Sequence, residues 1–182
     1  MRARNAAILA ILTSVCMAVQ LTPRPPNIEF TSLICFLTGL LFGSLFGMSV
    51  GTLTMLVNGF LSPWGFGGIN IPFQILGMAL IGFAGGVYRK YSMRVGNPSA
   101  RSFSIEVAFL AVILTLTYDV ITTLGYTLIF NVNLLLALIT GIWFTITHVI
   151  SNAVLFGTAL YALVRISNKI LGEQIWSYQK EP

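Results

Sequence analysis

Charged residues are scarce in this sequence. They make up 8% of its 182 residues, whereas a soluble domain carries about 25%. Hydrophobic residues make up 56% of the chain, so too little charge remains to cover a soluble surface. We therefore expect an integral membrane protein. Its apolar segments do not alternate with polar residues as barrel strands do, which predicts a single all-α membrane domain over residues 1–182.

Residues that bind metals or catalyse reactions are also rare. The chain has one histidine, His148, and no cluster of ligands with metal-binding spacing, so we expect no metal site. Cys16 and Cys35 fall in apolar segments, and their spacing fits neither a metal site nor a redox pair. We interpret them as two small buried hydrophobes. The chain also lacks the G-x-x-x-x-G-K-[ST] phosphate loop, and we expect no cofactor.

Long apolar runs are what the sequence does have, and they predict six transmembrane helices. The run 31–61 would form a helix of about 46 Å, too long for one crossing of a ~30 Å core and too short for two full crossings. A hairpin of two short helices that turns near Gly43–Ser44 resolves this difficulty. The expected helices cover about 6–21, 31–43, 45–61, 71–88, 103–126 and 134–166, with 127–133 as a weakly polar link.

Positive charge predicts the orientation of these helices. With six spans, Arg24 lies alone on one side, and nine basic residues lie on the other side with both termini. Five spans would place eight basic residues on one side and two on the other, which is a slightly weaker bias. We therefore expect a multi-pass plasma-membrane protein with both termini in the cytoplasm. Because the basic residues flank spans on one face, we expect contact with the lipid bilayer and no nucleic acid.

The segment GLLFGSLFGMSVG has a glycine at every fourth position and contains a G-x-S-x-G pattern. Ser49, Asp119 and His148 follow one another in the order used by α/β-hydrolases, which raises the alternative of an intramembrane hydrolase. That pattern requires a strand–turn–helix, and Ser49 lies in an apolar helix at a different expected depth, so we expect no enzyme. The spacing instead favours close helix packing, with homodimerisation as the other interpretation. The glycines are Gly39, Gly43, Gly47 and Gly51.

A few polar residues lie inside the expected spans, where an ionised side chain costs about 2.5–3.5 kcal/mol. Asp119 lies at a similar depth to His148 and Asn152, which share one helix face. A contact of Asp119 with either residue would form part of a binding site or a polar clamp between the last two helices. Aromatic and amide groups also gather on the outer side, as an aromatic belt or as a mixed pocket. These are Trp64, Phe66, Asn70, Phe73, Gln74, Tyr118, Tyr126 and Trp143.

With these residues in view, the chain resembles the substrate-binding S component of an energy-coupling factor (ECF) transporter. Ala6-x-x-x-Ala10, near the cytoplasmic end of the first helix, is similar to the small-residue motif that docks the transmembrane T component. The resemblance covers most of the chain. It is carried further by PNIEFTSLICFLTGLLFGSLFGMSVGTLTMLVNGFLSP (26–63), WGFGGINIPFQILGMALIGFAGGVYR (64–89), YDVITTLGY (118–126) and HVISNAVLFG (148–157).

The resemblance implies that the protein captures a vitamin or related micronutrient from outside. The loaded protein would topple in the membrane and release its ligand through a T component and two ABC-type ATPases. The PNIE loop favours a cobalamin-type ligand, although a flavin or another aromatic vitamin suits the aromatic residues equally. The expected ligand-binding residues are Asn27, Glu29, Trp64, Asn70, Gln74, Tyr118, Asp119, Trp143, His148 and Asn152.

Overall fold

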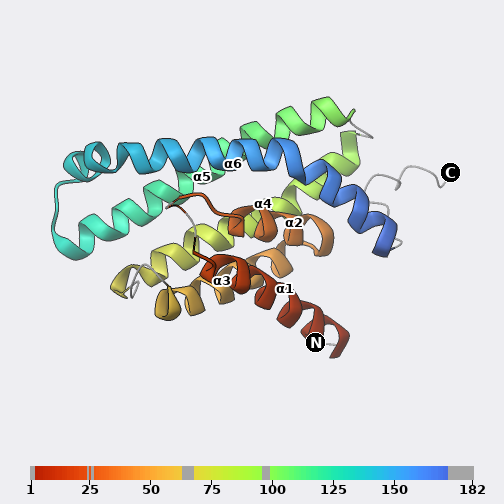
Figure 1. Cartoon of the computed structure of the whole chain (residues 1–182), viewed down its shortest axis with the longest axis horizontal. Helices are drawn as coiled ribbons and strands as arrows, with labels where there is room; N and C mark the ends of the chain where they lie inside the picture. Colours follow the sequence, from red (N-terminus) through yellow and green to blue (C-terminus); the bar gives the residue numbers. More distant parts are fainter. Residues whose placement is uncertain (1–2, 24, 26, 63–67, 96–98, 172–182) are drawn as a thin grey trace.

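The structure, a computed structural model, describes residues 3–23, 25, 27–62, 68–95 and 99–171, without the side chains at 93–95 and 171. These residues form six α-helices and one short 3₁₀ turn, and they contain no strand (Figure 1). The elements are α1 (Ala3–Leu21), α2 (Thr31–Phe42), α3 (Ser44–Leu61), η1 (Gly68–Asn70), α4 (Ile71–Val95), α5 (Ala100–Phe130) and α6 (Leu134–Leu171).

The apolar run 31–61 forms a helical hairpin, and its break lies at Gly43. This residue has φ +99°, a conformation that L side chains rarely adopt, and it separates α2 from α3. Five helices (α1, α3, α4, α5 and α6) are long and apolar enough to cross a membrane, whereas α2 is a shorter apolar helix of 12 residues. At ~1.5 Å per residue, α2 is about 18 Å long and does not reach across a ~30 Å core by itself.

Several helices are longer than the sequence predicts, most clearly α5. The residues expected to form a link from 127 continue this helix to Phe130, and Asn131 ends it in a left-handed conformation with φ +51°. Asn133 then caps α6, because its side-chain oxygen accepts hydrogen bonds from the backbone nitrogens of Leu135 and Leu136. Three residues therefore suffice for the connection.

Glycine allows α2 and α3 to pack against α4 with their backbones in contact. A Cβ atom added at Gly39 or Gly47 would lie 2.0 or 2.3 Å from the backbone oxygen of Gly82 in α4. A Cβ at Gly51 would lie 2.7 Å from the backbone oxygen of Met78. The glycine face is therefore turned toward another helix of the same chain.

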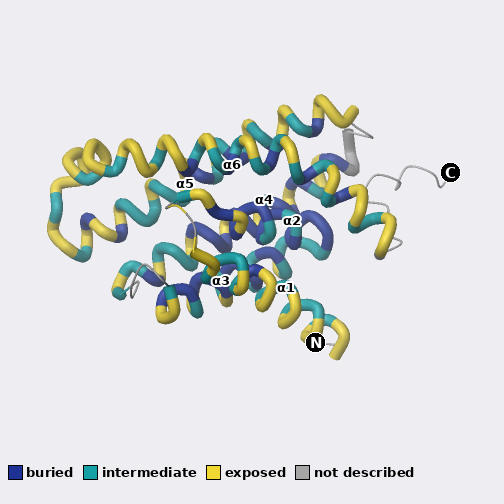
Figure 2. Tube along the Cα trace, in the orientation of Figure 1, coloured by how far each residue is buried: buried dark blue, intermediate teal, exposed yellow. Residues whose placement is uncertain are grey.

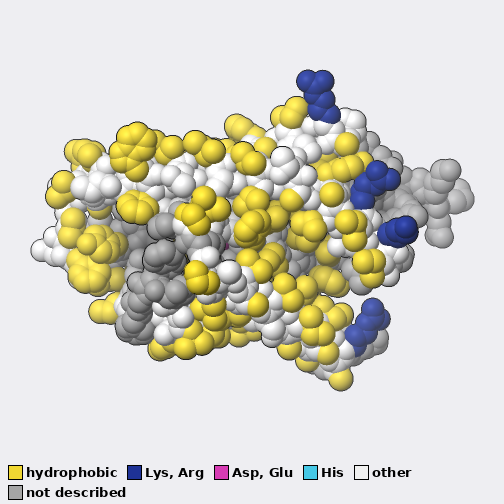
Figure 3. Space-filling view, in the orientation of Figure 1, with side chains coloured by type: hydrophobic (Ala, Val, Ile, Leu, Met, Phe, Trp, Pro, Cys, Tyr) yellow, Lys and Arg dark blue, Asp and Glu magenta, His cyan; other side chains and the backbone are white. Residues whose placement is uncertain are grey.

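The buried residues lie mainly where α2 meets α3, α4 and α6, while most of α1 and the far ends of α5 and α6 are exposed (Figure 2). On the face shown in Figure 3, hydrophobic side chains run along the length of the molecule and Lys and Arg side chains lie only at one end. Helix α1 begins and α6 ends toward that same end (Figure 1). An apolar surface along the molecule, with positive charge at one end, is expected of a membrane protein whose basic residues gather on one side of the bilayer.

Candidate ligand-binding site

Glu29 is a buried carboxylate in the segment that joins α1 to α2. Its Oε2 accepts a hydrogen bond from the backbone nitrogen of Thr31 at 3.2 Å, and its Oε1 accepts from the backbone nitrogen and hydroxyl of Ser32. The first turn of α2 therefore supplies donors to the carboxylate. Burial raises the pKa of Glu29, but the contacts with His148, Ser32 and Thr31 outweigh it and lower the pKa to about 2.

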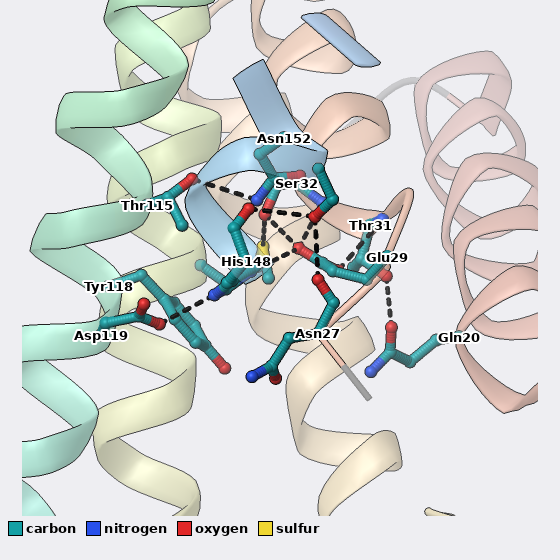
Figure 4. A network of polar contacts seen from close by, with 12 residues as sticks. Gln20, Asn27, Glu29, Thr31, Ser32, Thr115, Tyr118, Asp119, His148 and Asn152 are labelled. Carbon is teal, nitrogen blue, oxygen red and sulfur yellow. Dashed lines mark hydrogen bonds and ion pairs between the residues drawn. The ribbon is translucent and has the colours of Figure 1, made fainter. Parts of the chain in front are cut away.

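His148 in α6 lies between Glu29 and a second carboxylate, Asp119 of α5 (Figure 4). Its Nδ1 is 2.8 Å from Asp119 Oδ1, and its Nε2 is 3.5 Å from Glu29 Oε1. The two ring nitrogens of His148 therefore contact two different carboxyl groups, one from α5 and one from the segment before α2.

Neighbouring groups hold Glu29, His148 and Asp119 in place. The edge of the Tyr118 ring faces the His148 ring, at 86° and 5.8 Å between centroids. Ser151 in α6 donates a hydrogen bond to the backbone oxygen of Asn27 at 2.9 Å, which ties the segment before α2 to α6. Thr31 donates to Gln20 Oε1, so α1 is tied to the same segment.

Two cavities meet at these residues. One has a volume of about 590 Å³ and the other about 420 Å³, and they share Asn27, Gln74, Tyr118, Phe144 and His148. The larger cavity is also lined by Asn70, Asp119, Thr122, Thr123, Tyr126, Ala137, Thr140, Gly141 and Thr145. The smaller is also lined by Gln20, Glu29, Met55, Asn58, Ser62 and Met78. Both cavities are lined by polar side chains together with aromatic or apolar ones, so each can offer a ligand hydrogen bonds and apolar contact.

Most of the residues expected from sequence to bind a ligand line one of these cavities: Asn27, Glu29, Asn70, Gln74, Tyr118, Asp119 and His148. Asn152 does not; it is fully buried and donates to Thr115 Oγ1 at 3.0 Å. The structure does not bring Trp143 to the cavities, because its side chain is 75% exposed on α6. Trp64 and Phe66 lie outside the described residues.

Sequence reasoning missed several lining residues. Gln20 and Asn58 line the smaller cavity, and both are polar residues in apolar helices. The same signal identified Asp119 and could have identified them too. The lining threonines give no comparable signal. Thr140 bonds the backbone oxygen of Leu136 in its own helix, as threonines on lipid-facing surfaces also do.

Ser49 lies apart from this site. Its hydroxyl donates to the backbone oxygen of Leu45 in the same helix, and Ser49 lines neither cavity. The contacts of Asp119 and His148 therefore serve the cavity and not a serine nucleophile.

Comparison with known protein families decides what this membrane protein is. The family model described as "ECF-type riboflavin transporter, S component" matches residues 2–165, which is most of the chain. The chain belongs to this family. No curated protein and no solved structure matches it.

The S component is thus a substrate-binding membrane subunit of an ECF transporter, a transport protein and not an enzyme. S components bind small vitamin-type substrates and work with a T component and ATPases. The cobalamin-type interpretation is not confirmed, because the family is named for riboflavin.

Proposed function

We propose that this S component captures a vitamin-sized molecule in the cavities around Glu29, Asp119 and His148. One observation carries the proposal: Glu29, His148 and Asp119 contact one another beside the two cavities, in a chain of which only 8% of the residues are charged. Ionisable residues at membrane depth are expensive and usually mark a substrate site. The hydrogen bonds among these residues offset part of that free-energy cost, and a bound ligand would supply further hydrogen-bond partners.

Riboflavin is the first ligand to test. The family's name supports it. Cavities of about 590 and 420 Å³ lie within the ~300–1,000 Å³ typical of small-molecule sites. Tyr118, Tyr126 and Phe144 offer aromatic surface to a flat ring system. A corrinoid is much larger than a flavin and fits a cavity of this volume less well.

The site is expected to load from outside the cell. The larger cavity is lined by residues close to the α5–α6 connection, such as Tyr126 and Ala137, whereas Arg101 and Arg165 lie near the opposite ends of these helices. The excess of Lys and Arg at that opposite end favours the cytoplasm there, with both termini. The cavity then lies in the outer half of the membrane.

Delivery would depend on partners. Ala6 and Ala10 are both exposed on α1, as a surface that docks a T component requires. After docking, we expect the loaded S component to topple and release its ligand inside, with energy from two ABC-type ATPases. Short helices such as α2 suit a body that rotates in the bilayer.

The test is native mass spectrometry of the gently purified S component, followed by titration with riboflavin, thiamine, biotin and cobalamin. We expect a vitamin-sized molecule to co-purify or to bind, and riboflavin to bind most tightly. Binding of another vitamin would retain the capture function and replace the ligand. If nothing co-purifies and no compound binds, the cavity is not a capture site and the proposal is wrong.

A further inference from the structure

A further cavity lies away from His148, between the turn of the α2–α3 hairpin and the C-terminal part of α4, which runs toward the basic end of the molecule (Figures 1 and 3). Its volume is about 750 Å³. Phe42, Leu45 and Phe46 line it from the hairpin, and Arg89 and Lys90 line it from α4. No described residue lines both this cavity and either cavity of the candidate ligand-binding site.

The two basic residues of this cavity lie at the level of the membrane surface. From Ile71, the first residue of α4, to Arg89 the helix rises about 27 Å at ~1.5 Å per residue, close to the ~30 Å of a hydrocarbon core. The hairpin turns beside this part of α4, because the Ser44 hydroxyl donates to the backbone oxygen of Phe83 at 3.2 Å. The cavity therefore lies where acyl chains meet headgroups, on the side that we expect to be cytoplasmic.

Arg89 is held in place at the cavity and still has donors to offer. Its Nη1 donates to the backbone oxygen of Leu41, near the end of α2, at 2.7 Å. A guanidinium has several N–H donors in a planar fork, so this bond leaves others for a phosphate. Lys90 is exposed beside it. Among the described residues, no Asp or Glu lines the cavity and neither basic residue pairs with a carboxylate.

The apolar side of the cavity favours a lipid over a free anion. Leu45 is 77% exposed, and the rings of Phe42 and Phe46 lie 5.8 Å apart between centroids in the same wall, both partly exposed. An acyl chain would cover these side chains, whereas a soluble anion would leave them uncovered. The cytoplasmic leaflet supplies anionic phospholipids, and basic pockets between transmembrane helices on that side suit their headgroups.

We propose that this cavity binds one anionic phospholipid of the cytoplasmic leaflet, with the phosphate at Arg89 and Lys90 and an acyl chain along Leu45 and Phe46. Because α2 has only 12 residues, its hairpin leaves room beside the longer α4, and an inner-leaflet lipid fills that room. The inference does not rest on the proposed capture function, since the two sites share no described residue.

Native mass spectrometry of the delipidated protein in detergent tests the proposal without any substitution. The protein is titrated with phosphatidylglycerol and, separately, with phosphatidylcholine that has the same acyl chains. We expect one phosphatidylglycerol to bind at least about tenfold more tightly than phosphatidylcholine. Glycerophosphoglycerol, the same anionic headgroup without acyl chains, should not displace the bound lipid at matched concentration.

Variants of the basic residues locate the site. Lys90→Gln keeps the bond from Arg89 to Leu41 and should weaken phosphatidylglycerol binding about fivefold, with phosphatidylcholine unaffected. The double variant Arg89→Gln, Lys90→Gln should remove the preference. Arg101→Gln is the matched control, because Arg101 is an exposed basic residue at the start of α5 that does not line the cavity. Melting temperatures show whether each variant is folded.

Four results would overturn the proposal. The first is equal binding of the two lipids by the wild type, and the second is an unchanged preference in folded Lys90→Gln. The third is an equal loss of preference in Arg101→Gln, which would indicate surface charge without a site. The fourth is displacement by glycerophosphoglycerol, which would indicate a site for a soluble anion.

The same variants distinguish a lipid from an acidic partner protein. If Lys90→Gln stops the T component and ATPases from co-purifying and leaves the lipid preference intact, the basic residues bind a protein and the lipid proposal is wrong. None of these results bears on vitamin binding, so the capture function stands or fails by its own test.

Discussion

At the scale of single residues, Glu29 and Asp119 make different uses of the same partner. Both contact His148, but Glu29 also receives donors from the start of α2, whereas the buried Oδ2 of Asp119 has no hydrogen-bond partner among the described residues. We interpret Glu29 as the carboxylate that holds the segment before α2 in place. Asp119 is the carboxyl group that lines the larger cavity.

This difference predicts a pH effect that belongs to Glu29. Its pKa is about 2 in the folded protein, below the ordinary value of 4.5, so its ionised form stabilises the fold above pH 4.5. That stabilisation is lost as the pH falls from about 4.5 toward 2. Glu29→Gln should lower stability near neutral pH by about 1.5–3 kcal/mol, the value of hydrogen bonds to a charged group. The melting temperature of Glu29→Gln should also fall less than that of the wild type as the pH is lowered.

The measurement is thermal unfolding of the wild type and Glu29→Gln in one detergent, from pH 7 down to pH 3. Glu106→Gln provides the control, because it removes a carboxylate at the other end of the protein. If the melting temperatures of the wild type and Glu29→Gln fall by the same amount as the pH is lowered, ionised Glu29 does not stabilise the fold.

At the scale of helices, the close approach of α3 to α4 depends on glycine. A Cβ at Gly47 would lie 2.3 Å from the backbone oxygen of Gly82, and a backbone atom cannot move aside as a flexible side chain can. Gly47→Ala should therefore force the helices apart and destabilise the protein by about 1–3 kcal/mol or more. The expected result is a clear drop in melting temperature.

Gly141→Ala in α6 is the matched control, since a Cβ there would have no heavy atom within 4 Å. Its melting temperature should stay the same or rise slightly, because alanine favours helix over glycine. Equal melting temperatures for the two variants would show that the α3–α4 contact tolerates a side chain. A change in oligomeric state with Gly47→Ala, without loss of stability, would instead support dimerisation through this face.

At the scale of the whole molecule, α1 is attached more loosely than the other helices. Cys16 is its one buried residue among those described, and its Sγ lies 4.0 Å from Sγ of Cys35. The exposed positions Ala6 and Ala10 are available to a partner helix that approaches closely. We therefore expect docking and ligand capture to be separable functions.

Ala10→Trp tests this separation. A bulky indole on α1 should abolish uptake by cells that also produce the T component and ATPases, while the purified variant binds its ligand with unchanged affinity. Ile113→Trp, an exposed apolar position on α5, is the control and should preserve uptake. Loss of ligand binding together with uptake in Ala10→Trp would contradict a docking role for this face.

The sequence by itself determined the membrane class, the helical fold, the hairpin break at Gly43 and the family. These depend on composition, on the length of apolar runs and on local backbone preferences, which can be read along the chain. It also placed Asp119 and His148 at the same depth, which the structure shows as a direct contact.

Only the tertiary structure decided which polar residues share a site. Glu29 and His148 are 119 residues apart, and their contact depends on how the segment before α2 lies against α6. Asn152 and Trp143 lie on either side of His148 in the sequence. Asn152 donates a hydrogen bond to Thr115 of α5, whereas Trp143 is exposed, because a helix turns nearby side chains to different faces. Packing between distant segments, which no local pattern records, therefore defines the ligand site.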